Sequence, residues 1–310
     1  MRLIAAPLAV LLTGLTGCAA TSATSAAPGT RASTQAGAQA NSVPSVRASG
    51  GAGQAAKPES GGTADAPAAE AKLPSGATAV AAAIRKNTAA LYEAVDAGSA
   101  DVPLYALYQQ RVYRMLARNR ALSAQVTAKL AKPLAAEAAD NITAVSKLLS
   151  MARPITAAQR AKIRLARPEP AKRLRAHMVA AEKRFGVEWE VLAAIMLVET
   201  RFGRVRSSSS TGAQGPMQFM PGTWKQYGLG GDVHDARDAV LAAANYLKAS
   251  GAPRDYRKAV FAYNHDTRYV DAVLAHARQM KRDPRSFHAY YNWQVFVLSA
   301  KGDVRLTGPR

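Results

Sequence analysis

Residues 191–203 read VLAAIMLVETRFG, an apolar run of helical character that contains one carboxylate near its end. Leu192, Ile195, Met196 and Glu199 follow the spacing i, i+3, i+4 and i+7, so the carboxylate is expected on the apolar face of a helix. Burial and the negative end of the helix dipole both disfavour the charged form and raise the pKa of Glu199. A carboxyl group that stays protonated near neutral pH is suited to general acid catalysis.

The same carboxylate also has a purely structural interpretation, as one half of a buried ion pair. Arg201 and Arg204 are close enough in sequence to supply the guanidinium group. Taken alone, Glu199 would favour this second interpretation, and the segments that follow it decide between the two.

Three further motifs follow Glu199–Thr200: GPMQFMPGTW at 215–224, AANYL at 243–247 and AYN at 262–264. In order, residue type and spacing they resemble the successive motifs of the lytic transglycosylase domain, over about residues 180–281. Each motif is weak by itself, whereas four in register are specific. The flanking runs QFMPGTWKQYG and AYNHDTRYVDAV resemble the membrane-bound and actinobacterial branches of that family.

This resemblance implies a mainly α, lysozyme-like fold of the goose-type and transglycosylase kind, and it assigns roles to residues. Glu199 would be the catalytic acid and base, Gln218 and Asn264 would hydrogen-bond the sugar, and Tyr263 would orient the carboxyl group. The site serine matches Ser209 when counted back from Gln218, and Ser208 when counted forward from Glu199. The implied substrate-binding residues are Thr200, Ser209, Met217, Gln218, Tyr263 and Asn264.

The implied reaction cleaves the β-1,4 bond between MurNAc and GlcNAc in peptidoglycan and leaves a 1,6-anhydro ring. Ordinary glycoside hydrolysis needs a second carboxylate, and Asp232, Asp235 and Asp266 are better interpreted as helix caps or surface charges. Two alternatives stay open, a hydrolysing muramidase on the same fold and a wall-binding lipoprotein without activity. We expect no cofactor and no metal, because the histidines lack metal-ligand spacing.

The first residues have the features of a bacterial export signal. Arg2 precedes the apolar run LIAAPLAVLLTGL, and Leu15-Thr16-Gly17-Cys18 resembles a lipobox. We therefore expect residues 1–18 to be a lipoprotein signal peptide and Cys18 to carry the lipid, with an ordinary signal peptide as the alternative. Two acyl chains anchor a protein stably, which predicts a location in the cell envelope, on the outer face of the cytoplasmic membrane or on the outer membrane.

Composition divides the rest of the chain. Residues 19–76 are rich in Ala, Ser, Gly and Pro and are expected to form a disordered linker. Residues 77–170 have helical periodicity, with Pro103 and Pro133 at helix starts. They are interpreted as a helical region packed on the catalytic domain, or alternatively as a spacer or partner-binding hairpin.

Residues 171–282 are assigned to the catalytic domain and residues 283–310 to a C-terminal extension with a possible β-hairpin, whose turn is expected at Gly302-Asp303. The net charge of +20 fits a solvated basic surface with affinity for wall polyanions, and export argues against a nucleic-acid partner. Helices are expected at 171–185, 187–200, 221–227, 235–249, 254–264 and 266–281.

Overall fold

The computed structural model describes residues 66–309, which form twelve helices and one β-hairpin. Cys18, the expected signal peptide and most of the predicted linker lie outside these residues. None of the described helices is both long enough and apolar enough to cross a membrane. In chain order the helices are α1 (Ala77–Asp96), α2 (Val102–Leu116), α3 (Arg120–Thr127), α4 (Lys132–Met151), α5 (Ala157–Ala161), α6 (Ala171–Phe185), α7 (Trp189–Thr200), α8 (Pro221–Tyr227), α9 (Ala236–Ala249), α10 (Tyr256–Tyr263), α11 (Thr267–Arg282) and α12 (Arg285–Tyr291).

Local signals account for most helix boundaries. Pro103 and Pro133 lie in the first turns of α2 and α4, where proline costs no hydrogen bond. The side chains of Asp235, Asp255 and Asp266 accept backbone N–H groups at the starts of α9, α10 and α11. Such caps satisfy donors that a helix start leaves without partners.

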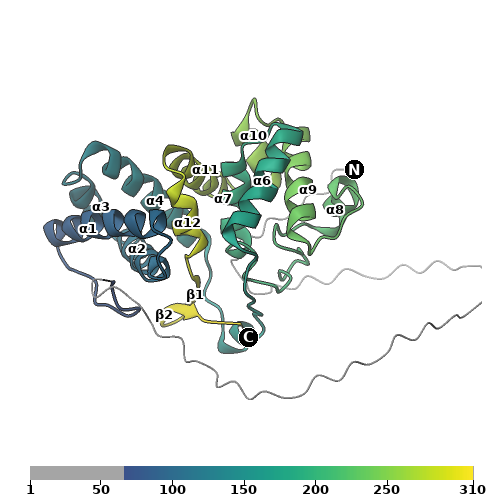
Figure 1. Ribbon diagram of the computed structural model, residues 1–310. Coiled ribbons are helices and arrows are strands. Elements are labelled where there is room, and N and C mark those ends of the chain that lie inside the picture. Colours follow the sequence, from purple (N-terminus) through teal and green to yellow (C-terminus); the bar gives the residue numbers. More distant parts are fainter. Residues whose placement is uncertain (1–65, 310) are drawn as a thin grey trace, which may run out of the picture. The chain divides into compact units, whose positions relative to one another are not determined.

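The fold class predicted from the sequence, mainly α with a small C-terminal hairpin, is confirmed. Helix α7 lies in the middle of the arrangement, packed against α6 and α11 (Figure 1). Helix α11 in turn packs along α4, and α9 contacts α6, α8 and α10. One hydrophobic cluster runs through both the N-terminal and the C-terminal helices, from Val80 to Trp293. The helices of 77–170 therefore pack on those of 171–282.

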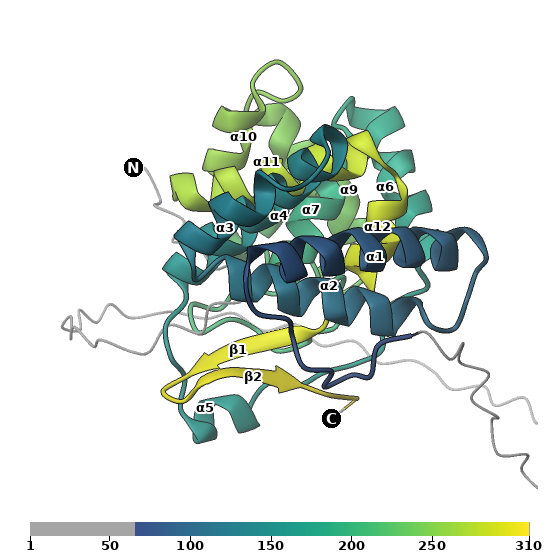
Figure 2. The same ribbon diagram turned by 90° about the vertical axis from the view of Figure 1, so that its left-hand side faces the viewer.

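Strands β1 (Val295–Ser299) and β2 (Gly302–Leu306) form the antiparallel hairpin, with Val295 opposite Leu306. The turn consists of residues 300–301, and Gly302 already pairs with Ser299, so the predicted turn at Gly302-Asp303 is displaced by two residues. The hairpin lies beside α5 (Figure 2) and shares a small apolar cluster with residues 155–165 and Val205.

Residues 66–76, which the composition placed in the disordered linker, are attached to the helices. The Arg111 guanidinium donates to the carbonyl oxygens of Ala69 and Ala71, at 3.1 and 2.8 Å, and Leu73 packs against the core. Glu70 pairs with Arg305 on β2 at 2.6 Å. The prediction of disorder up to residue 76 is therefore wrong for these last residues, because a distant arginine supplies the hydrogen bonds that the segment cannot make itself.

Candidate active site

Glu199 is the penultimate residue of α7, and its side chain is 2% exposed. Eleven of the twelve residues of α7 are buried. The predicted apolar stripe is therefore only part of the buried surface, because α7 is enclosed by neighbours rather than lying on the surface with a polar face. Arg201 follows in the left-handed conformation, with φ 52°, and ends the helix.

The carboxyl group of Glu199 has one hydrogen-bond donor among the described residues. The Tyr269 hydroxyl donates to Oε1 at 2.6 Å, whereas Oε2 is buried and has no partner. Burial raises the pKa of Glu199 well above its usual range, and the hydrogen bond from Tyr269 opposes that rise. Burial therefore favours the protonated form of the group, and the oxygen free to carry a proton is Oε2.

The ion-pair interpretation of Glu199 is wrong for this structure. The Arg201 side chain donates to the carbonyl of Leu197, and the Arg204 side chain donates to the carbonyl of Arg201. No ion pair within 4.0 Å joins either guanidinium to Glu199 in the described part of the chain. Among residues 66–309 Glu199 therefore has no counter-ion, and burying its charged form in this way would cost stability.

Tyr263 lies at the end of α10, and its hydroxyl donates to the Met217 carbonyl at 2.6 Å. Burial raises the pKa of Tyr263 well above its usual range, and the charge of a Glu199 carboxylate would raise it further. The direct contact expected between Tyr263 and the carboxyl group is made instead by Tyr269, because Tyr263 is committed to the loop backbone. Tyr269 is the residue that the sequence interpretation missed.

Thr200 joins the end of α7 to the loop that carries Gln218. Its hydroxyl donates to the Pro216 carbonyl at 2.6 Å and accepts the N–H of Gly203 at 2.9 Å. Thr200 is fully buried, so it positions the backbone of the loop and has no exposed surface of its own. The hydroxyl group that the resemblance implies at this position therefore forms hydrogen bonds with backbone groups of the protein itself.

Backbone constraints fix the conformation of that loop. Gln214 and Phe219 exchange two backbone hydrogen bonds, at 2.9 and 2.8 Å, and Gln218 between them has φ 52°. A Cβ at Gly215 would lie 1.8 Å from the Val233 carbonyl oxygen, so glycine is required there. The Gln218 side chain is half-buried, and its amide donates to the Gly215 carbonyl at 2.9 Å.

Asn264 follows α10 directly and is 1% exposed. Both polar atoms of its side chain, Oδ1 and Nδ2, are buried without a hydrogen-bond partner. Leaving a buried amide unpaired costs roughly 1–3 kcal/mol per group. Together with Glu199 Oε2, Asn264 thus contributes polar atoms whose partners are not supplied by the described residues, as expected of groups that contact a ligand.

The remaining predicted residues have structural contacts. The Ser209 hydroxyl accepts the Ala213 N–H at 2.8 Å and lies 3.1 Å from the Thr211 hydroxyl, whereas Ser208 is exposed. The Met217 side chain is fully buried in the core, and its contribution to the site is the carbonyl that accepts from Tyr263.

The carboxylates considered as second catalytic groups act as local caps. Asp235 and Asp266 accept N–H groups at the starts of α9 and α11, and Asp266 also pairs with Arg268 at 2.5 Å. Asp232 accepts the N–H of His234 at 2.8 Å. Among residues 66–309 no group of three or more histidine, cysteine or acidic side chains is arranged to hold a metal ion.

The buried acid, the Tyr263–Met217 contact and the Gln218 loop all lie within one segment. Residues 177–285 match the family model of the Transglycosylase SLT domain. The SLT domain has a lysozyme-like fold, in agreement with the predicted fold class. It covers α7 to α11 and so includes Glu199, Tyr269 and each of the predicted substrate-binding residues.

One curated relative is a membrane-bound lytic murein transglycosylase F from Thiobacillus denitrificans. It is 29% identical over 129 residues, which make up 39% of this chain and 27% of the relative. The chain thus spans about a quarter of the length of the curated relative that it matches. No solved structure matches the chain.

Proposed function

We propose that this protein is a peptidoglycan lytic transglycosylase that cleaves the MurNAc–GlcNAc β-1,4 bond. The observation that carries the proposal is the state of Glu199, a buried acid held by Tyr269 with Oε2 left free. The match of residues 177–285 to the SLT domain and the murein transglycosylase name of the relative support it.

In the proposed first step, Glu199 donates its proton to the glycosidic oxygen. Because Tyr269 donates to Oε1, that proton resides on Oε2. Positive charge develops at the anomeric carbon of MurNAc, and the substrate's own 2-acetamido group takes the part that a second carboxylate plays in ordinary glycosidases. Asp232, Asp235 and Asp266 are engaged as caps, which supports a mechanism with one carboxylate.

In the second step the Glu199 carboxylate removes the proton from the C6 hydroxyl, and the oxygen closes the 1,6-anhydro ring. Tyr269 stabilises this anionic form of Glu199, since its hydroxyl donates to the carboxylate oxygen. No water is consumed, and Glu199 is left protonated for the next cycle. The unpaired amide of Asn264 and the side chain of Gln218 are assigned to the hydroxyl and N-acetyl groups of the sugar.

We also propose that the enzyme acts in the cell envelope, anchored by a lipid on Cys18. The motif Leu15-Thr16-Gly17-Cys18 and the membrane-bound relative support this location. The linker of Ala, Ser, Gly and Pro would then let the enzyme reach glycan strands away from the membrane.

The decisive experiment is digestion of purified peptidoglycan by the full-length protein, followed by mass analysis of the products. Transglycosylase chemistry predicts 1,6-anhydro-MurNAc ends, which are lighter by one water than hydrolytic ends. Glu199→Gln should reduce turnover by about 10²–10⁴-fold or more, since it removes the proposed proton donor. Reducing ends as the main product would identify a hydrolysing muramidase instead. A folded wild type that yields no products would favour the binding lipoprotein.

A further inference from the structure

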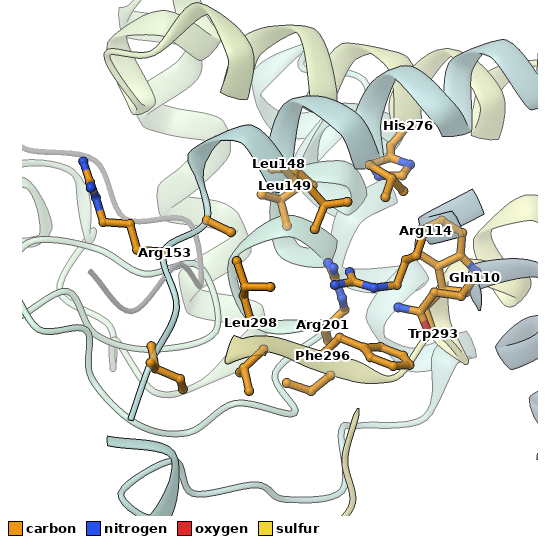
Figure 3. Close-up of a pocket in the computed structure, with 16 residues that line it drawn as sticks. Gln110, Arg114, Leu148, Leu149, Arg153, Arg201, His276, Trp293, Phe296 and Leu298 are labelled. Atoms are coloured by element: carbon orange, nitrogen blue, oxygen red, sulfur yellow. The ribbon is translucent and has the colours of Figure 1, made fainter. Parts of the chain in front are cut away.

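A cavity of about 70 Å³ lies where the ends of α4 and α7 meet α11 and strand β1 (Figure 3). Its polar wall contains Arg114, Arg201 and His276, and its apolar wall contains Leu148, Leu149 and Val297. None of the residues assigned to the glycan reaction lines it. The cavity therefore belongs to no function described so far.

Arg201 is the central cation of this cavity. Its side chain donates to the Leu197 carbonyl, and no carboxylate of residues 66–309 forms an ion pair with it. Burial and the nearby charges of Arg114 and Arg204 lower the pKa of Arg201 to about 9. A guanidinium held in this way gains stability from any anion that reaches it.

The nearby carboxylate of Asp303 does not neutralise Arg201, because it is bound by Arg114. Arg114 forms a bidentate pair with Asp303, at 2.7 and 2.8 Å, and Arg118 pairs with the same carboxylate at 2.6 Å. Arg114 and Arg118 thus share one carboxylate, and Arg201 has no part in this pairing. Figure 3 shows the guanidinium groups of Arg114 and Arg201 close together beside strand β1, whereas Arg153 extends away from them.

His276 supplies an independent sign of a ligand. It is 1% exposed, it lines the cavity, and its Nδ1 atom is buried without a partner. Edge contacts with Tyr290 and Trp293, at centroid distances of 4.7 and 5.6 Å, fix the orientation of the ring. Burial and the charge of Arg201 lower the pKa of His276 to about 3, so the ring is neutral and can donate one N–H.

We propose that this cavity binds an organic carboxylate, with its oxygens on Arg201 and His276 and a small apolar substituent against Leu148, Leu149 and Val297. A guanidinium fork matches the planar carboxylate group. Inorganic phosphate fits less well, because it would place charged oxygens against the apolar wall. The ligand is either a free small acid or the C-terminus of a peptide, since both present the same chemistry.

Calorimetric titration of the full-length protein tests the proposal with matched probes. Propionate should bind, whereas propionamide, its neutral counterpart, and inorganic phosphate should bind at least tenfold more weakly. Equal binding of propionate and propionamide, or a preference for phosphate, would overturn the carboxylate assignment. Acetyl-Ala-Ala binding more tightly than propionate would indicate a peptide C-terminus, and the reverse order a free acid.

Variants locate the site. Arg201→Met should weaken propionate binding at least tenfold, because a charge-assisted hydrogen bond is lost. It should not lower the melting temperature of the free protein, since an unpaired buried charge is removed. His276→Phe keeps the ring contacts and should also weaken binding, which covers the case in which Arg201→Met fails to fold. Arg254→Met, which removes the same charge from an exposed residue outside the cavity lining, should change binding less than twofold. Unchanged binding in both Arg201→Met and His276→Phe, or an equal loss in Arg254→Met, would place the anion elsewhere.

Discussion

The hydroxyl of Tyr269 lies 2.6 Å from Oε1 of Glu199, although the two residues are 70 positions apart in the chain. Tyr269 stands in the first turn of α11 and Glu199 in the last turn of α7, and these helices pack against each other. The contact holds one carboxyl oxygen and leaves the other free. It also favours the ionised form of Glu199, against the larger effect of burial.

Tyr269→Phe should therefore raise the pKa of Glu199 further. The alkaline limb of the kcat/KM profile, where the acid loses its proton, should move to higher pH. Turnover should fall as well, because the carboxylate needed as base in the second step is less stabilised. Profiles of kcat and kcat/KM against pH on soluble glycan fragments measure both effects.

Tyr263→Phe is the matched control for that variant. It removes the hydrogen bond to the Met217 carbonyl but leaves the one between Tyr269 and Glu199 intact. It should lower the free energy of unfolding by about 1–2 kcal/mol without moving the alkaline limb. A larger displacement of the limb in Tyr263→Phe than in Tyr269→Phe would assign the orienting role to Tyr263.

Glu199→Gln should become more stable relative to wild type as the pH rises. The pKa of Glu199 is higher in the folded state than in the unfolded state. Its neutral form therefore makes its whole contribution to the free energy of unfolding at pH values below the unfolded-state pKa. That stability is lost as the pH rises from the unfolded towards the folded pKa, at about 1.4 kcal/mol per pH unit. Glutamine does not titrate.

Urea unfolding of both proteins from pH 4 to pH 8 measures this difference. Other buried groups are present in both proteins, for example Glu137, whose pKa burial raises to about 7. Their contributions cancel in the difference between the two free energies of unfolding. A difference that stays constant with pH would show that the pKa of Glu199 is not raised.

Thr200→Val should loosen the loop that carries Gln218. The two side chains have similar shapes, but valine leaves the Pro216 carbonyl and the Gly203 N–H without partners. We expect a loss of about 2–4 kcal/mol in the free energy of unfolding, together with reduced turnover. Thr200→Ser keeps the hydroxyl and should retain most of both. Equal losses in the two variants would mean that packing of the methyl group matters more than the hydrogen bonds.

Two truncated chains test whether residues 66–76 contribute to the stability of the fold. A chain that begins at residue 66 keeps the contacts of Arg111 with Ala69 and Ala71, whereas one that begins at residue 77 loses them. The shorter chain should be less stable by about 1–3 kcal/mol, to which the exposed Glu70–Arg305 pair adds little. Both should cleave soluble glycan fragments. Identical urea midpoints for the two chains would mean that the contacts of residues 66–76 contribute nothing.

Cys18→Ser tests the anchor. If Cys18 carries the lipid, this variant should leave the membrane fraction or remain unprocessed, with a mass that includes the first seventeen residues. Fractionation and mass measurement of the wild type and the variant decide the matter. Unchanged fractionation and an unchanged pattern of masses would contradict lipidation.

The helices of the SLT segment could be predicted closely from local signals. Expected ranges such as 171–185 and 221–227 agree with α6 and α8, because glycine and proline mark their ends and apolar spacing marks their faces. Helix α12 was missed, since seven residues following Asp283 and Pro284 offer too short a pattern. The sequence predicts the hairpin but displaces its turn, because Gly302 has the residue type of a turn and yet begins β2.

The candidate site was only partly accessible from the sequence. Glu199, Gln218 and Asn264 belong to short motifs and could be named, whereas the partner of Glu199 could not. Tyr269 lies on the buried face of α11, and nothing local distinguishes a tyrosine that meets a carboxyl group from one that fills the core. Likewise, the attachment of residues 66–76 depends on Arg111, which no pattern within the segment indicates.

The packing of α4 along α11 has a consequence for anyone who wishes to isolate or transplant the catalytic machinery. Arg278 and Arg282 of α11 form ion pairs with Asp140 of α4, at 2.6 and 2.8 Å. Lys147 of α4 forms an ion pair with Asp271 of α11 at 3.2 Å. A gene fragment cut at the limits of the SLT match would discard α4 and expose the side of α11 that it covers. Helix α11, which carries Tyr269, would then lose the helix that packs along it. The smallest fragment that keeps this packing therefore begins well upstream of residue 177.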